Sequence, residues 1–261
     1  NTGLELSLGY GHTWNNNFRW DSNFTLSHNK NKIKELVRDY VHPETGELIN
    51  KDRLDVGGLG KARFILKEGG TLGDLYTQSD LKRDDNGMVD IDPTGIVAIE
   101  NNLPDIKLGS VFPKANLAWS NHFSWKGISL SALFTARIGG IVYSATEAAM
   151  DQYGVSERSA LARDNGGVLV NNRTLVDAQN YYTTIGSESG LPQYYTYNAT
   201  NVRLQEASIG YLIPRKWLGN VCDIQVSVIG RNLWMIYNKA PFDPESVATT
   251  DNYYQGIDYF M

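Results

Sequence analysis

Apolar and polar side chains alternate with a period of two residues along several stretches of the chain. The clearest of these begins near Val221, where one parity is apolar and the other is polar. The apolar parity consists of Cys222, Ile224, Val226 and Val228. The polar parity consists of Asp223, Gln225 and Ser227. Such alternation is typical of a β-strand whose two faces meet different surroundings.

The same pattern, applied along the whole chain, predicts six long strands. We expect them over residues 3–14, 18–30, 113–124, 128–138, 201–213 and 221–236. The fifth strand contains a slip, because its apolar positions lie on one parity up to Leu204 and on the other from Ala207 onward. One extra residue near Gln205, a β-bulge, would return both apolar sets to one face. Pro214 ends this strand because proline has no N–H to donate.

The connections between these strands alternate between short and long. Short turns are expected at residues 15–17, 124–127 and 214–220, and long connections at 29–113 and 141–200. Tryptophans gather at the short turns, namely Trp14, Trp20, Trp125 and Trp217. Outer-membrane β-barrels have short turns at one end, long loops at the other and aromatic girdles at the membrane interfaces. The tryptophans would also suit the core of a soluble β-protein, so the pattern alone leaves both classes open.

The long connections are expected to be mostly irregular, with two local elements. A tight hairpin turn is predicted at residues 85–87, and a short helix around residues 146–153. Asp84, Asp90 and Asp92 surround the turn and supply oxygen atoms of the kind that calcium prefers. The ligand spacing of a calcium loop is incomplete, however, so turn formation is the favoured explanation and no metal site is predicted.

Composition excludes several classes of function. The net charge of −5 argues against nucleic acid, since there is no basic surface to neutralise phosphates. No run of about 18 apolar residues exists, so a transmembrane helix is excluded, whereas a transmembrane barrel is not. The single Cys222 cannot form an internal disulfide, and the four histidines lack metal-ligand spacing. No nucleophile motif or paired-carboxylate signature is present, so we predict neither catalysis nor a cofactor.

A tyrosine cluster in the second long connection is the main candidate binding feature. Its members are Tyr181, Tyr182, Tyr194, Tyr195 and Tyr197. Tyrosine combines a rigid apolar ring with a hydroxyl group, which suits stacking on sugars or anchoring a protein partner. The same residues could instead pack against one another within a long loop, and both interpretations stay open.

The order of several motifs resembles the C-terminal barrel region of the SusC-like (SusC/RagA) TonB-dependent outer-membrane transporters. Three of them are VRLQEASIGYLIPRKWL at residues 202–218, VSVIGRNLWMIY at 226–237 and FDPE at 242–245. The segment GLELSLGY at residues 3–10 resembles an earlier hairpin of the same barrels, and EGGTLGDLY at 68–76 resembles an intervening loop. The matches follow the order of that family across nearly the whole chain.

This resemblance implies an all-β fold, namely an antiparallel transmembrane β-barrel segment in a bacterial outer membrane. Its polar rows would face the lumen, with Arg19, Asp21, Asn23 and Arg137 as lumen-facing candidates. The implied partners are outer-membrane lipid, a SusD-like surface lipoprotein and the TonB complex, and the implied substrate is an oligosaccharide or a peptide. The alternative from another class is a secreted soluble β-sandwich that binds carbohydrate.

We also expect residues 1–261 to be part of one barrel, without a plug domain and with long loops at about 29–113, 141–200 and 239–261. Bacterial barrels have at least about eight strands, because an open edge in lipid leaves backbone groups unpaired. The first and sixth predicted strands should therefore hydrogen-bond to the remainder of the barrel, outside this sequence.

Overall fold

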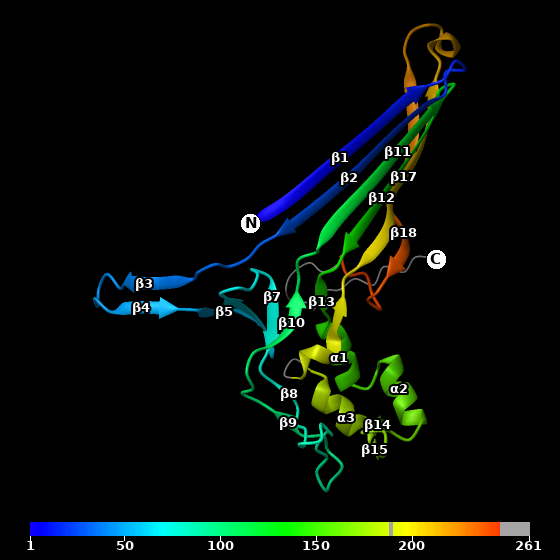
Figure 1. Ribbon diagram of the computed structural model, residues 1–261. Helices are drawn as coiled ribbons and strands as arrows, with labels where there is room; N and C mark the ends of the chain where they lie inside the picture. The colour runs from blue at the N-terminus through cyan, green and yellow to red at the C-terminus, as the bar shows by residue number, and fades with distance from the viewer. Residues whose placement is uncertain (188–189, 246–261) are drawn as a thin grey trace.

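Six long antiparallel strands form one sheet in the computed structural model, which describes residues 1–187 and 190–245 (Figure 1). Their order in the sheet is β1-β2-β11-β12-β17-β18. The bounds are β1 Thr2–Thr13, β2 Arg19–Lys30, β11 Ala115–Trp125, β12 Ile128–Ile138, β17 Asn201–Ile213 and β18 Ile224–Asn238. Each lies within three residues of its predicted range, so the period-two pattern located all six strands.

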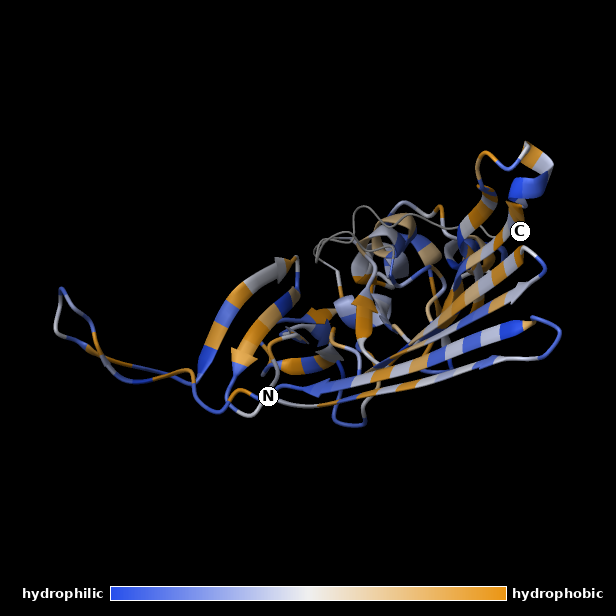
Figure 2. Ribbon diagram, turned by 90° about the horizontal axis from the view of Figure 1, so that it is seen from above, coloured by the Kyte–Doolittle hydropathy of each residue, from blue (hydrophilic) through white to orange (hydrophobic). Residues whose placement is uncertain are grey.

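The register places residues of like character side by side across all six strands. One row is apolar throughout and consists of Leu8, Phe24, Trp119, Phe134, Leu204 and Trp234. A row of opposite parity is polar throughout and consists of Glu5, Ser27, Asn116, Arg137, Asn201 and Asn238. Figure 2 shows this alternation as bands of contrasting hydropathy along the strands. The sheet thus has an apolar face and a polar face.

The predicted bulge in β17 is present. Leu133 of β12 pairs with Glu206 of β17, and the next residue, Phe134, pairs with Leu204. Gln205 therefore has no partner on β12, which is the extra residue that the parity slip required. Because of this bulge, Leu204 and Ala207 project on the same face.

The three short turns lie at one end of the sheet, which we call the short-turn end. Aromatic rings gather there: Trp14 stacks at a tilt on Phe18, Trp20 stacks on Phe123, and Tyr211 lies beside Trp217. Both long connections leave from the opposite end. The predicted alternation of short and long connections is therefore observed.

The first long connection is not irregular, and that expectation is wrong. It contains β3 Val37–Val41, β4 Leu48–Lys51, β5 Arg53–Leu59, β6 Ala62–Lys67, β7 Asp74–Thr77, β8 Asp80–Leu81, β9 Ile99–Glu100 and β10 Ile106–Ser110. Four of these form a second sheet in the order β10-β7-β6-β5. The strands are too short and too interrupted by turns to show alternation over a useful window, which explains the error.

The second long connection contains three helices between short strands. Its elements are β13 Ile141–Tyr143, α1 Ala145–Gln152, α2 Glu157–Asp164, β14 Val168–Val170, β15 Thr174–Val176, α3 Ala178–Ile185, η1 Pro192–Tyr195 and β16 Thr196–Asn198. The predicted helix is α1, which Ser144 caps by accepting a hydrogen bond from the Glu147 N–H. Helices α2 and α3 were not predicted, although Ser156 and Asp177 cap them in the same way.

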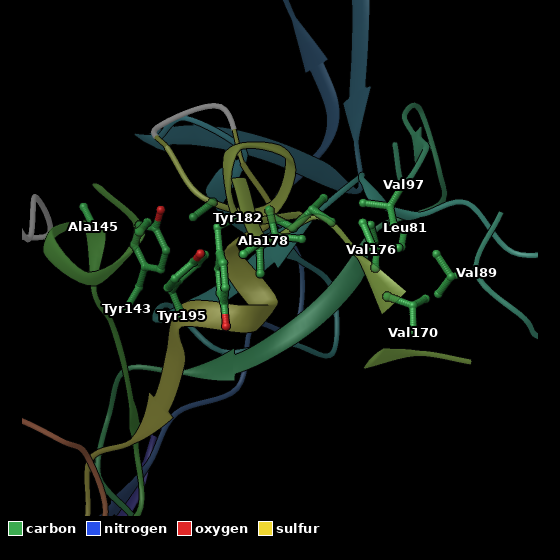
Figure 3. Packing of buried hydrophobic residues seen from close by; sticks show 14 of the residues in the cluster. Leu81, Val89, Val97, Tyr143, Ala145, Val170, Val176, Ala178, Tyr182 and Tyr195 are labelled. Carbon is green, nitrogen blue, oxygen red and sulfur yellow. The ribbon is translucent and has the colours of Figure 1, made fainter. Parts of the chain in front are cut away.

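The two long connections pack together into one body, which we call the loop domain (residues 31–114 and 139–200). Figure 3 shows its core, where Val89 and Val97 from the first connection lie beside Val170 and Val176 from the second. Leu191 and Tyr195 are fully buried in the same cluster. No helix in the described part of the chain is long and apolar enough to cross a membrane.

Candidate binding site where the sheet meets the loop domain

A buried ion pair joins β17 to the segment that follows β18. The Arg203 guanidinium donates from Nη1 to Asp243 Oδ2 at 3.0 Å, and its Nη2 donates to Asp243 Oδ1. Glu245 Oε2 lies 3.4 Å from the same Nη2. Arg203 and Asp243 are 4% and 6% exposed, so bulk water does not reach this ion pair. We call the ion pair of Arg203 with Asp243 the clamp. The strand motif and the FDPE motif, which are far apart in sequence, are thus in direct contact.

The segment that carries the clamp folds back over the polar face of the sheet. Its backbone turns at Pro244, where the Glu245 N–H donates to Asp243 Oδ1 at 2.9 Å. Asn201 Nδ2 donates to Glu245 Oε1 at 3.2 Å and holds the end of the turn against β17. These bonds keep Glu245 above the polar row that contains Arg137.

A cavity of about 460 Å³ opens between this turn, the sheet and the loop domain. Its walls are apolar apart from two charged residues, Arg137 and Glu245. The lining residues are Leu59, Ala62, Phe64, Leu75, Val111, Phe112, Pro113, Arg137, Ile141, Val142, Tyr143, Pro244 and Glu245. We call this the junction cavity. A second hollow on the polar face shares both charged residues with it.

Arg137 forms the polar floor of the junction cavity. Its Nη2 donates to the Val111 carbonyl oxygen at 2.6 Å. Among residues 1–187 and 190–245, no carboxylate lies within ion-pair distance of this guanidinium, and its Nε is buried without a hydrogen-bond partner. The positive charge therefore lacks a counter-charge in the described structure.

Buried polar atoms without partners gather around the same place. Among the residues described, these atoms include Thr135 Oγ1, Arg137 Nε, Asn201 Oδ1 and Arg203 Nε. Thr135 pairs with Arg203, and Arg137 pairs with Asn201, in the register of β12 and β17. Buried polar groups are normally hydrogen-bonded to protein or to ordered water. A cluster of four unpaired atoms marks this patch as the place where a further polar group is needed.

The other lumen-facing candidates lie far from the junction cavity, toward the short-turn end. Arg19 and Asp21 form an ion pair at 2.6 Å on the polar face of β2, and Asn23 accepts a hydrogen bond from Ser7. Arg137 lies in the row of Ser27, which is four residues along β2 from Asn23 and eight from Arg19, or about 13 Å and about 26 Å of strand. The structure therefore puts all four candidates on the polar face but does not bring them together.

The tyrosine cluster lies inside the loop domain. Tyr195 is fully buried, and its hydroxyl group donates to Asp151 Oδ2 at 2.8 Å. Burial, followed by the charge of Asp151, raises the pKa of Tyr195. Tyr182 packs edge-on against Tyr181, whose pKa is raised to about 12 by burial. A ligand would contact the half-buried tyrosines directly, namely Tyr181, Tyr194 and Tyr197. Their role in binding stays a prediction.

Tyr197 is separate from the other tyrosines and lies beside the clamp. Its hydroxyl group donates to Glu147 Oε2 at 2.5 Å, and its ring meets Phe242 edge-on at 5.6 Å between centroids. Phe242 immediately precedes Asp243 in the FDPE motif. Tyr197 thus connects α1 of the loop domain to the segment that covers the polar face.

The aspartate-rich stretch forms two successive turns of the same kind. Asp84 accepts hydrogen bonds from the N–H groups of Asn86 and Met88. Asp92 does the same eight residues later with the N–H groups of Thr94 and Ile96. In the described part of the chain, no group of three or more potential ligand residues could hold a metal ion. The carboxylates are used by turns, as the sequence favoured.

Sequence reasoning missed the residues that build this site. Asp243 and Glu245 appeared only within the FDPE motif, and Arg203 only within the motif at residues 202–218. The parity of β17 could have identified Arg203 as a charged residue on the polar face. Its contact with a loop 40 residues away had no signal in a single sequence.

Comparisons with known proteins agree with this architecture. No protein-family profile matches the sequence. "TonB-dependent receptor P3" of Formosa agariphila is 25% identical over 290 residues, covering 99% of this chain and 27% of the receptor. A solved structure of the RagAB peptide transporter superposes with a TM-score of 0.62 at 18% identity, covering 93% of this chain and 26% of that one. The "closed-closed" state of the RagAB peptide importer gives 0.59 over the same shares.

The chain is therefore a homologue of a TonB-dependent receptor, and its antiparallel sheets have the fold of a segment of such a transporter. Among solved structures, that segment has its counterpart in RagAB. The chain spans about a quarter of the length of the relatives it matches. Those relatives are a receptor and transporters, and none is an enzyme.

Proposed function

We propose that this chain forms part of the wall of a bacterial outer-membrane transporter. In this role the apolar face contacts lipid, and the polar face borders an aqueous lumen. The continuous apolar and polar rows across all six strands carry the proposal, because a wall between two media requires opposite faces of this kind. Val228, Trp234 and Leu8 are 70%, 60% and 58% exposed on the apolar face, which suits lipid and not water.

The edges of the sheet support the same role. β1 and β18 each pair with one neighbour in the described sheet. In hydrocarbon, unpaired backbone groups cost several kcal/mol each, so both edges need further strands. We propose that the remainder of the same barrel supplies them, together with a plug domain that couples to the TonB complex.

We further propose that the loop domain lies outside the cell and that the transporter imports peptides or oligosaccharides with a SusD-like surface lipoprotein. The gathering of both long connections at one end supports the first point, because outer-membrane barrels keep their long loops outside. The similarity to a peptide transporter supports a peptide substrate. The resemblance to SusC-like proteins supports the oligosaccharide alternative and the lipoprotein partner.

Lipid contact can be tested by fluorescence quenching on the intact transporter. In a Cys222→Ser background, Val228→Cys and the adjacent Ser227→Cys would each carry an environment-sensitive dye. Brominated lipids should quench the dye at residue 228, and aqueous iodide should quench it at residue 227. Equal quenching at both positions, or a protein that stays monodisperse without detergent, would overturn the proposal in favour of a soluble β-sandwich.

A further inference from the structure

We propose that the junction cavity binds an apolar side chain of a peptide and that Arg137 holds an oxygen atom of the same peptide. This inference rests on the proposed transport function and selects between its two substrate classes. It combines three observations on one place: the apolar walls, the uncompensated guanidinium and the cluster of unpaired polar atoms.

The walls favour a peptide side chain over a sugar. Eleven of the thirteen lining residues are apolar, among them Leu59, Phe64 and Leu75 from the loop domain. A sugar presents several hydroxyl groups in every direction, and each would lose its hydrogen bond to water against such walls. An aliphatic or aromatic side chain has no such groups and gains from leaving water. The cavity volume of about 460 Å³ lies within the range typical of small-ligand sites.

Arg137 adds a specific polar requirement to this apolar space. Its guanidinium donates to one carbonyl oxygen and has no carboxylate within ion-pair distance among the residues described. A partly buried cation without a counter-charge is best satisfied by a carboxylate or carbonyl oxygen. Every peptide carries such an oxygen next to its side chains, either within the main chain or at the C-terminus.

Two residues of β17, the strand next to that of Arg137, also have unpaired polar atoms in the described structure, although neither residue lines the cavity. Asn201 and Arg203 are 0% and 4% exposed, and each has one side-chain atom without a partner among the residues described. The apolar walls and the polar floor together match an amino-acid residue, which is apolar at its side chain and polar at its main chain.

The clamp positions the remaining wall. Arg203 holds Asp243, and this contact places the neighbouring Pro244 and Glu245 in the wall of the cavity. Glu245 also restricts the charge of the ligand, because it repels a second carboxylate. We therefore infer that the cavity takes neutral apolar residues and rejects acidic ones.

The test uses the intact transporter that contains this chain, purified in detergent, with titration calorimetry. The probes are the tetrapeptides Gly-Gly-Gly-Leu, Gly-Gly-Gly-Ser and Gly-Gly-Gly-Glu, the C-terminal amide of the first, and maltotetraose. We expect the leucine peptide to bind at least about tenfold more tightly than the serine peptide, the glutamate peptide and the sugar. Weaker binding of the amide would identify the terminal carboxylate as the partner of Arg137, and equal binding would identify a main-chain carbonyl oxygen.

Two substitutions address the cavity separately. Arg137→Gln should weaken binding of the leucine peptide about tenfold or more, because it removes a charged hydrogen-bond donor. Leu59→Trp should weaken binding by narrowing the cavity. Arg215→Gln, which changes an exposed arginine at the short-turn end, serves as the matched control and should leave affinity unchanged. Resistance to unfolding in unheated detergent gels checks that each variant retains its barrel.

Equal affinity for the leucine and serine peptides would overturn the inference, as would tighter binding of the sugar. Wild-type affinity in folded Arg137→Gln and Leu59→Trp variants would do the same. None of these outcomes affects the quenching at residues 227 and 228, so a wrong cavity assignment is distinguishable from a wrong membrane assignment.

Discussion

The long sheet and the loop domain differ in how they bury their apolar side chains. The sheet leaves its apolar face uncovered, with Val228 at 70% exposure. The loop domain has a closed core in which Leu191 and Tyr195 are fully buried. The loop domain therefore has a core of its own, although single apolar side chains such as Val155 stay exposed on it, whereas the described sheet has one continuous apolar face that nothing covers.

The two regions of this one chain therefore have different sources of stability. Packing stabilises the loop domain, and membrane insertion with closure by neighbouring strands is expected to stabilise the sheet. The clamp and the junction cavity lie beside the boundary between the long sheet and the loop domain. Four experiments test this comparison.

The largest effect is expected at the clamp. Asp243→Ala leaves the buried Arg203 without its main partner, so we expect a loss of about 3–5 kcal/mol in the free energy of unfolding. Urea unfolding of the intact transporter in lipid vesicles measures it. Combining Asp243→Leu with Arg203→Met removes both charges and should recover most of the loss. An Asp243→Ala variant as stable as the wild type would show that the clamp does not contribute to stability.

The next effect separates the two faces of the sheet. Val228→Arg puts a charge on the apolar face, in a row where Val228 pairs with Ile209, and should cost about 2–4 kcal/mol near the bilayer midplane. Ser227→Arg, on the polar face, should cost far less. Val226 pairs with Tyr211 nearer the turn, so Val226→Arg should fall between the two. The same urea titration applies, and equal costs at residues 227 and 228 would contradict the assignment of faces.

A pH effect is expected in the loop domain alone. Arg53 and then Lys67 lower the pKa of Asp105 from 3.8 to about 2, against an opposing effect of burial. The folded state thus binds the proton less readily than the unfolded state. Stability of roughly 2 kcal/mol should be present above about pH 4 and be lost as the pH falls toward 2.

Hydrogen–deuterium exchange of the loop-domain amides between pH 5 and 2 checks this effect, because all six tryptophans of the chain lie in the long sheet and its short turns. Asp105→Asn should lower stability at pH 5 and flatten the dependence. Asp85→Asn is a suitable control, because Asp85 is exposed and its carboxylate has no ion-pair partner among the described residues. An unchanged pH profile in Asp105→Asn would show that the pair with Arg53 does not contribute.

The smallest effect is expected for the exposed pair on the polar face. Arg19→Gln breaks the contact with Asp21, but both side chains are solvated and salt screens their attraction. We expect no measurable change in the urea midpoint. A large loss would mean that this part of the polar face is covered in the assembled protein, for instance by a plug domain.

The sequence predicted the sheet well because long strands between two media keep strict alternation. Even the bulge at Gln205 was visible, since a slip of one residue exchanges the faces of every later side chain. The strands of the loop domain could not be predicted in this way. They are two to seven residues long and bend at positions such as Gly58, where φ is +159° and a Cβ would lie 2.1 Å from the Ala62 carbonyl oxygen.

The site was harder to predict than the fold. Arg137 was placed on the polar face by parity, and the register confirms that position. Its apolar surroundings come from Leu59, Val111 and Ile141, which different segments bring together only through tertiary packing. The tyrosine cluster shows a different limit of sequence analysis. The sequence identified the group of aromatic residues, but not that Tyr195 would be buried with its hydroxyl group bonded to Asp151.

The pairing of β2 with β11 has a consequence for how such chains can change over evolution. Ser27 pairs with Asn116, so the whole first part of the loop domain is an insertion between two adjacent strands. The entropy of closing a loop grows only slowly, at about 0.6 kcal/mol for each doubling of its length. Insertions and deletions can therefore accumulate in this segment with little penalty to the sheet. Related proteins should share the wall closely while differing in the size and shape of the body that it displays.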